Sequence, residues 1–197
     1  MADVGNVNRP QGLRPVGTVG SAGYCGRIQV FATSTSDSAA IGIGDPVIPT
    51  STGDANGLMV ATRLTQAGTT QILGAVVGIV PDPTNLTTTF RAASSATKIL
   101  VDTDPNTIYE VSDSDTVTNT TSIAITDIGQ NCTLALGTVD TTTGNGRTVL
   151  GTTIGTTTTL DVKILGLSPK VGNLVGDYAK YLVKINRSAY ANNVAGI

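Results

Sequence analysis

The short length of the apolar runs restricts the fold of this 197-residue chain more than any other feature. No stretch of ten or more residues combines apolar positions at i, i+3, i+4 and i+7 with helix-forming residues between them. Short β-branched runs instead alternate with Gly, Pro, Asn and Asp, which is typical of strands joined by turns. Of the 14 acidic residues, 13 are Asp, which favours turns. The sequence therefore predicts an all-β fold, a sandwich or barrel of short, mainly antiparallel strands.

The expected strands follow one another along most of the chain. Thr, which occurs 33 times, suits such strands because its branched side chain packs on a pleated surface while its hydroxyl tolerates water. The segments with β-branched enrichment or two-residue alternation are 24–33, 41–48, 58–64, 71–80, 98–102, 107–112, 122–126, 132–136, 148–150, 160–167 and 178–185.

The chain is predicted to have three parts. Residues 1–23 are rich in Gly, Pro and Asn without a periodic apolar face, so we expect an extended N-terminal arm that is disordered or lies along a partner. Residues 24–190 are expected to form a single β-rich domain. Within it, the low-complexity Thr/Gly tract 138–159 is predicted to be a mobile loop with a brief strand. Residues 191–197 would form a C-terminal tail.

The absence of His excludes the commonest catalytic sites. The usual Ser/His/Asp and Cys/His arrangements and the His-based zinc sites all need that residue. Cys25 and Cys132 match no CxxC pattern and are predicted to be buried free thiols rather than a disulfide or a metal pair. We therefore expect no enzyme, no catalytic residue, no cofactor and no metal. An enzyme that uses two carboxylates stays open as an alternative, although no Asp pair is singled out by its spacing.

The charge distribution gives no indication of nucleic-acid binding. The chain has 12 basic residues, widely spaced, and a net charge of -2, whereas duplex-binding proteins gather positive charge on one face. The first residues lack the basic segment followed by an apolar segment that marks a signal peptide. We therefore expect no export by the general secretory route. The uncharged stretch 64–81 contains several Thr and Gln, which favours a buried strand over a membrane helix. Neither a nucleic acid nor a membrane is expected as a partner.

One acidic segment is similar to the start of a calcium-binding loop. Asp102, Asp104 and Asn106 place oxygen ligands at alternate positions. The loop then requires Gly and Glu where this chain has Thr107 and Ser112. The sequence instead favours an Asx turn between two antiparallel strands.

Aromatic residues gather near the C-terminus. Tyr178, Tyr181 and Tyr190 lie among the final residues, beside Lys180 and Arg187. One interpretation is a closing strand whose buried face carries Tyr181. The other is a contact surface, because Tyr and Arg are enriched at protein interfaces. The sequence leaves both interpretations open.

Several motifs resemble those of one protein family. The run Asn8-Arg9-Pro10-Gln11-Gly12-Leu13-Arg14-Pro15-Val16 resembles the "P-x-G-L-x-P-V" opening of tailed-phage head decoration proteins, also called capsid cement proteins. Segments that look like later landmarks of that family follow in order, at 44–47, 72–78, 109–111, 127–129, 161–167 and 180–186. The long Thr tract and the tail after Asn186 depart from the family pattern.

The resemblance implies a non-enzymatic virion protein that binds the outer surface of an icosahedral bacteriophage capsid and bridges neighbouring major capsid subunits. It would be made in the host cytoplasm, would stabilise the capsid, and would form a small homo-oligomer, with a trimer favoured over a dimer. Residues 1–23 and the C-terminal segment would contact the capsid. The expected interface residues are Arg9, Pro10, Leu13, Arg14, Pro15, Tyr178, Tyr181, Arg187 and Tyr190.

The alternative from another class is a carbohydrate-binding or host-adhesion β module. Such modules use exposed aromatic platforms, and this chain has no Trp and five Tyr.

Overall fold

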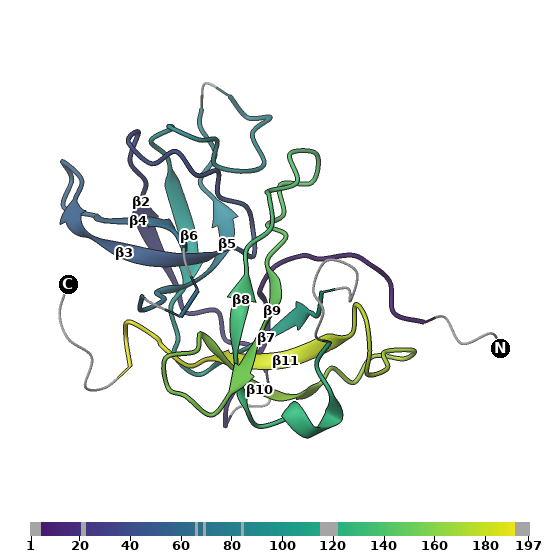
Figure 1. Cartoon of the computed structure of the whole chain (residues 1–197). Helices are drawn as coiled ribbons and strands as arrows, with labels where there is room; N and C mark the ends of the chain where they lie inside the picture. The colour runs from purple at the N-terminus through teal and green to yellow at the C-terminus, as the bar shows by residue number, and fades with distance from the viewer. Residues whose placement is uncertain are drawn as a thin grey trace.

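The computed structural model describes residues 5–20, 23–65, 67–68, 70–83, 85–114 and 122–191. Within these residues the chain forms eleven β-strands and one short 3₁₀ turn, η1 (Ile125–Asp127), which confirms the predicted all-β class. The strands form a six-stranded sheet and a closed five-stranded barrel that lie side by side (Figure 1). No helix in these ranges is long and apolar enough to cross a membrane.

The six-stranded sheet takes one strand from near the start of the chain and five from its second half. Every neighbouring pair in it is antiparallel, in the spatial order β1-β7-β11-β10-β8-β9. Its strands are β1 (Arg14–Thr18), β7 (Thr107–Ser112), β8 (Asn131–Ala135), β9 (Val149–Gly155), β10 (Val162–Leu167) and β11 (Lys180–Ile185). Strands β1 and β9 are therefore the two edges of this sheet.

The barrel is built from a continuous part of the chain that lies between β1 and β7. Its strands are β2 (Ile28–Ala32), β3 (Pro46–Gly53), β4 (Met59–Arg63), β5 (Gly74–Ile79) and β6 (Lys98–Asp102). They close in the order β2-β4-β3-β5-β6, and only the β2–β4 contact at Ala32 and Val60 is parallel among the named strands.

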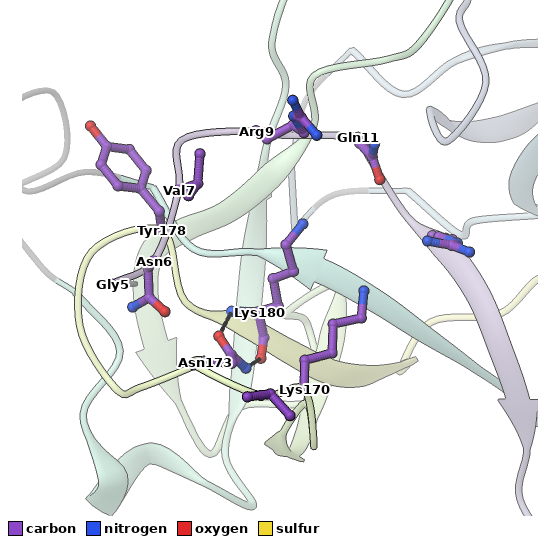
Figure 2. Close-up of a pocket in the computed structure, with 12 residues that line it drawn as sticks. Gly5, Asn6, Val7, Arg9, Gln11, Lys170, Asn173, Tyr178 and Lys180 are labelled. Carbon is purple, nitrogen blue, oxygen red and sulfur yellow. Dashed lines mark hydrogen bonds between the residues drawn. The ribbon is translucent and has the colours of Figure 1, made fainter. Parts of the chain in front are cut away.

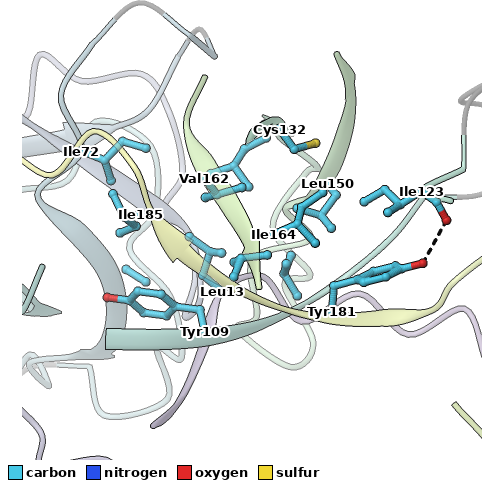
Figure 3. Packing of buried hydrophobic residues seen from close by; sticks show 14 of the residues in the cluster. Leu13, Ile72, Tyr109, Ile123, Cys132, Leu150, Val162, Ile164, Tyr181 and Ile185 are labelled. Carbon is cyan, nitrogen blue, oxygen red and sulfur yellow. Dashed lines mark hydrogen bonds between the residues drawn. The ribbon is translucent and has the colours of Figure 1, made fainter. Parts of the chain in front are cut away.

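Two apolar clusters form the core. The larger cluster lies on the six-stranded sheet and includes Tyr109 from β7 and Tyr181 from β11 (Figure 3). The Tyr181 hydroxyl donates a 3.0 Å hydrogen bond to the Ile123 carbonyl, so its polar end is satisfied inside the core. Residues from the barrel side, such as Ile72, also pack into this cluster. The smaller cluster fills the barrel around Phe31 and Ile99.

Most of the predicted strands are confirmed, and those at 98–102 and 107–112 have the expected bounds. The turn between these two strands has the predicted Asx geometry, because the Asp104 and Asn106 amides donate to the carboxylates of Asp102 and Asp104. However, β6 belongs to the barrel and β7 to the sheet. The turn therefore connects two separate sheets rather than the strands of one hairpin.

One expectation about secondary structure is wrong, and one expected strand is longer than predicted. The alternation at 122–126 does not form a strand. Ile123 is buried and Ile125 is exposed, but Asp127 accepts a hydrogen bond from the Ala124 amide and closes η1. In the Thr-rich tract, the brief strand expected at 148–150 extends through Val149–Gly155 and pairs with β8.

Candidate interaction surface

The predicted N-terminal arm is partly a packed element. Leu13 is fully buried in the larger cluster, and the residues after it form edge strand β1, paired with β7. The expectation of an unpacked arm over residues 1–23 is thus wrong from Leu13 to Thr18. A register shift between Pro15 and Gly17 breaks the side-chain alternation that would have marked the strand in the sequence.

Two interlocked glycines fix the point where the N-terminal segment joins the barrel. Gly12 and Gly44 have φ of +69° and +89°, a region that L-residues rarely adopt. A Cβ on Gly12 would lie 2.4 Å from the Gly44 carbonyl oxygen, and one on Gly44 would lie 2.3 Å from the Gln11 carbonyl oxygen. The Leu13 amide donates a 2.8 Å hydrogen bond to the Gly44 carbonyl. This contact seats Leu13 in the core and leaves the residues before Gly12 on the surface.

The surface segment Gly5–Gln11 lies against the loop between β10 and β11. The Asn6 side chain forms two hydrogen bonds with Leu174, one to its carbonyl at 2.6 Å and one from its amide at 3.1 Å. The loop is itself held closed by Asn173, whose side chain bonds the Ser168 carbonyl and both backbone groups of Lys180. We call the region between these two parts of the chain the N-terminal groove.

The N-terminal groove brings together four basic side chains. Arg9 and Arg14 come from the N-terminal segment and β1, while Lys170 and Lys180 come from the β10–β11 loop and β11. Lys170 and Lys180 extend toward the segment that carries Arg9 (Figure 2). Tyr178 also lines the groove, with a positive φ of +60° that is unusual for a bulky residue.

Glu110 positions one wall of this groove. Its buried carboxylate accepts a 2.6 Å hydrogen bond from the Lys170 ammonium and a 2.7 Å bond from the Ser168 hydroxyl. Burial alone would raise the pKa of Glu110, but the hydrogen bonds from Lys170 and Ser168 and the nearby positive charges outweigh it and lower the pKa. Glu110 is therefore ionised and holds the β10–β11 loop against β7.

Replacing Glu110 by Gln should lower the free energy of unfolding by about 1 kcal/mol at neutral pH, since Lys170 is half exposed and its pairing is weakened by solvent. The pKa of Glu110 is lower in the folded than in the unfolded protein, so its stabilisation is complete above the unfolded pKa. It is lost as pH falls through the folded pKa. Melting temperatures of wild type and E110Q should differ at neutral pH and converge in acid, as pH falls below the lowered folded pKa of Glu110. A difference that stays constant over this range would contradict the assignment.

The predicted interface residues are only partly brought together. Arg9, Arg14 and Tyr178 line the N-terminal groove, whereas Pro10 and Pro15 line neighbouring hollows. Leu13 and Tyr181 are fully buried core residues and offer no surface. For Tyr181, the closing-strand interpretation is thus the one the structure supports, because β11 alternates buried and half-buried positions.

The remaining predicted residues lie elsewhere. Arg187 donates a 3.3 Å hydrogen bond to the Thr159 carbonyl, and Tyr190 lies with Arg27 and Pro105 beside another hollow. Residues 192–197 of the predicted C-terminal tail are outside the described residues.

Sequence reasoning did not assign Lys170, Asn173, Glu110 or Asn6 to the site. The Asn6–Leu174 contact joins opposite ends of the chain, so no local pattern marks it. The one feature of the sequence that could have drawn attention to these residues is that Glu110 is the single Glu.

A second charged cluster is centred on the buried Asp45. Oδ1 of Asp45 accepts hydrogen bonds from the Thr148 hydroxyl at 2.9 Å and from Nη2 of Arg63 at 3.0 Å. Oδ2 accepts a 2.9 Å bond from the Gly42 amide and lies 3.0 Å from Nε of Arg63. Arg63 also donates to the Gly137 carbonyl. This cluster joins the barrel to the chain that leads into β9, and all of its partners come from the protein itself.

The two thiols lie in different surroundings. Neither Cys25 nor Cys132 forms a disulfide, and Cys25 is exposed, which corrects the expectation that both are buried. Burial raises the pKa of Cys132 to about 12, so its thiolate is scarce at neutral pH. No group of three or more Cys, Asp or Glu could hold a metal ion among the described residues.

Comparison with known proteins finds no matching family model, no matching curated protein and no matching solved structure.

Proposed function

We propose that the chain is a structural virion protein that binds the outside of an icosahedral tailed-phage capsid and cements neighbouring major capsid subunits. In this proposal the protein has no catalytic role, and a small homo-oligomer, with a trimer favoured, would repeat over the shell. Repetition on a lattice adds avidity, so a modest contact at each site suffices for stable binding. The ordered motifs that resemble head decoration proteins support this proposal.

The observation that carries the proposal is the exposed backbone of the N-terminal segment. Among the described residues, the backbone of Val7–Gln11 makes no hydrogen bond to another backbone group. This segment has no secondary structure and leads directly into the anchored Leu13 (Figure 1). Unpaired amides and carbonyls on an extended segment can add a strand to the exposed edge of a neighbouring protein. An anchored segment of this kind suits a protein that bridges subunits.

The carbohydrate-binding alternative has less support. Sugar-binding β modules stack sugar rings on exposed aromatic side chains. Of the described aromatic residues, Tyr190, at 41% exposure, is the one that is largely exposed. The structure thus offers a single small aromatic surface rather than a platform.

Deleting residues 2–9 should abolish binding to capsids and leave the fold intact. The deletion ends before the Gly12–Gly44 contact and before β1, so none of the strands and core residues in the described part of the chain is removed. Binding should be measured by cosedimentation with purified phage heads that lack the protein. Far-UV circular dichroism and melting temperature should match those of the wild type.

A matched variant replaces residues 2–9 by a Gly/Ser segment of equal length. It should also bind poorly, because strand addition takes its specificity from alternate side chains and a flexible Gly/Ser segment loses more conformational entropy when it is ordered. Unchanged occupancy of heads by the deletion variant would refute the role of the segment. Failure of the wild-type protein to bind heads would refute the proposed function itself.

A further inference from the structure

The N-terminal groove is a surface hollow between two distant parts of the chain. It encloses about 510 Å³ between residues that are far apart in the sequence, with Asn6, Val7 and Arg9 on one side and Lys170, Asn173 and Lys180 on the other (Figure 2). The hydrogen bonds between Asn6 and Leu174 hold the two sides together, and those between Asn173 and Lys180 keep the β10–β11 loop closed. The groove is therefore a built feature rather than a gap between loops.

Positive charge in the groove exceeds the acidic charge that compensates it. Arg9, Arg14, Lys170 and Lys180 line it, and Glu110 is the acid paired with one of them. Asp177 precedes Tyr178 in the sequence but is not among the lining residues. Burial lowers the pKa of Lys180, although the negative charge of Glu110 raises it. Repulsion from Lys170, Arg14 and Arg9 adds to the lowering. Four of the chain's 12 basic residues thus crowd one site of a protein with net charge -2.

Apolar side chains border this positive charge. Val7 is 57% exposed, Leu174 is 52% exposed, and Val171 is fully exposed. Val175 in the same loop is also exposed. Adjacent exposed apolar side chains rimmed by polar groups mark protein interaction sites. Tyr178, with its left-handed backbone, adds a strained residue of the kind that gathers at binding sites.

We propose that the N-terminal groove binds an extended segment of a partner protein that carries both carboxylate and apolar side chains. The four basic residues would pair with the carboxylates, and Val7, Val171 and Leu174 would cover the apolar side chains. If the proposed function is correct, that segment belongs to the major capsid protein, and this identification of the partner rests on that function. Nucleic acid is the weaker candidate, because a phosphate backbone offers nothing to the exposed valines and leucine.

The test uses a charge-altered variant of the full chain, Arg9→Glu with Arg14→Gln. Both side chains are exposed, and neither bears on the core. The matched control is Arg27→Glu with Lys163→Gln, which changes the net charge equally at two exposed positions outside the groove. Circular dichroism should show that both variants are folded.

The probe is a fluorescent peptide of alternating Glu and Leu, and its binding is followed by anisotropy. The groove variant should bind the peptide at least about tenfold more weakly than the wild type, while the control variant binds like the wild type. Binding should weaken as salt is raised from about 50 to about 300 mM, which shortens the screening length. A peptide with Ser in place of Leu should also bind more weakly.

Three outcomes of the peptide measurement would overturn the proposal: no binding of the peptide, equal loss in both variants, or tighter binding of a single-stranded DNA of equal charge. Head binding separates this inference from the proposed function. If wild type and groove variant bind heads equally, the groove proposal fails and the capsid function stands. If the groove variant loses peptide binding but the wild type binds no heads, the groove proposal stands and the capsid function fails.

Discussion

Replacing Asp45 by Asn is expected to lower the free energy of unfolding by about 3–5 kcal/mol, because it removes the fully buried counter-charge of Arg63, whose side chain is only 13% exposed. Asn also presents an NH₂ group where the carboxylate now accepts bonds from Gly42, Thr148 and Arg63. The packing leaves no room for rearrangement, since a Cβ on Gly146 would lie 2.2 Å from the Asp45 carboxylate. Loss of this cluster therefore weakens the junction between barrel and sheet directly.

Thermal unfolding by calorimetry measures the effect of D45N. A loss of this size corresponds to a fall of roughly 6–20 °C in melting temperature for a chain of this length. The matched control is Asp104→Asn, which preserves the Asx turn and removes only a 3.6 Å pairing with Arg27, a side chain that is 75% exposed. The control should change stability by less than about 0.5 kcal/mol. Equal effects of the two substitutions would contradict the structural role of Asp45.

Replacing Arg91 by Met should also destabilise the protein by about 3–5 kcal/mol. Arg91 is completely buried, and its guanidinium donates hydrogen bonds to the carbonyls of Ser34, Ala39 and Ser95. It also lies 3.5 Å from the Asp37 carboxylate. Met fills a similar volume but donates nothing, so three carbonyls lose the hydrogen bond from Arg91 and the Asp37 carboxylate loses its positive partner.

The Arg91 prediction is checked by denaturant unfolding followed by circular dichroism. The midpoint should fall while the slope with denaturant stays unchanged, since the surface exposed on unfolding is the same. Arg27→Met is the matched control, because Arg27 is exposed and its loss should cost less than about 0.5 kcal/mol. An R91M midpoint equal to that of the control would show that the loops around Arg91 do not depend on it.

The sequence predicted elements whose signal is local. Strands β6 and β7 have alternating or β-branched residues bounded by turn residues, and their bounds agree with the structure. The buried face of β11 was visible in the same way, through Tyr181 and its neighbours. Where the alternation is misleading, as at Ile123 and Ile125, a nearby Asp side chain ends the extended backbone.

Features that depend on distant contacts could not be predicted. Strand β1 is defined by its partner β7, which follows only after the whole barrel. The N-terminal groove needs Asn6 to meet Leu174, and widely spaced basic residues in the sequence give no sign that four of them converge. Arg91 sits in a Thr-, Ala- and Ser-rich loop, where an Arg would ordinarily be expected in solvent.

The position of the barrel between β1 and β7 also sets an order of events during synthesis. The barrel strands are continuous in the chain, so they can pair while the ribosome is still translating the second half. The six-stranded sheet needs β11, the last strand to emerge, and one wall of the N-terminal groove lies between β10 and β11. A polypeptide that ends before β11 would thus lack one wall of the N-terminal groove and with it the proposed binding site.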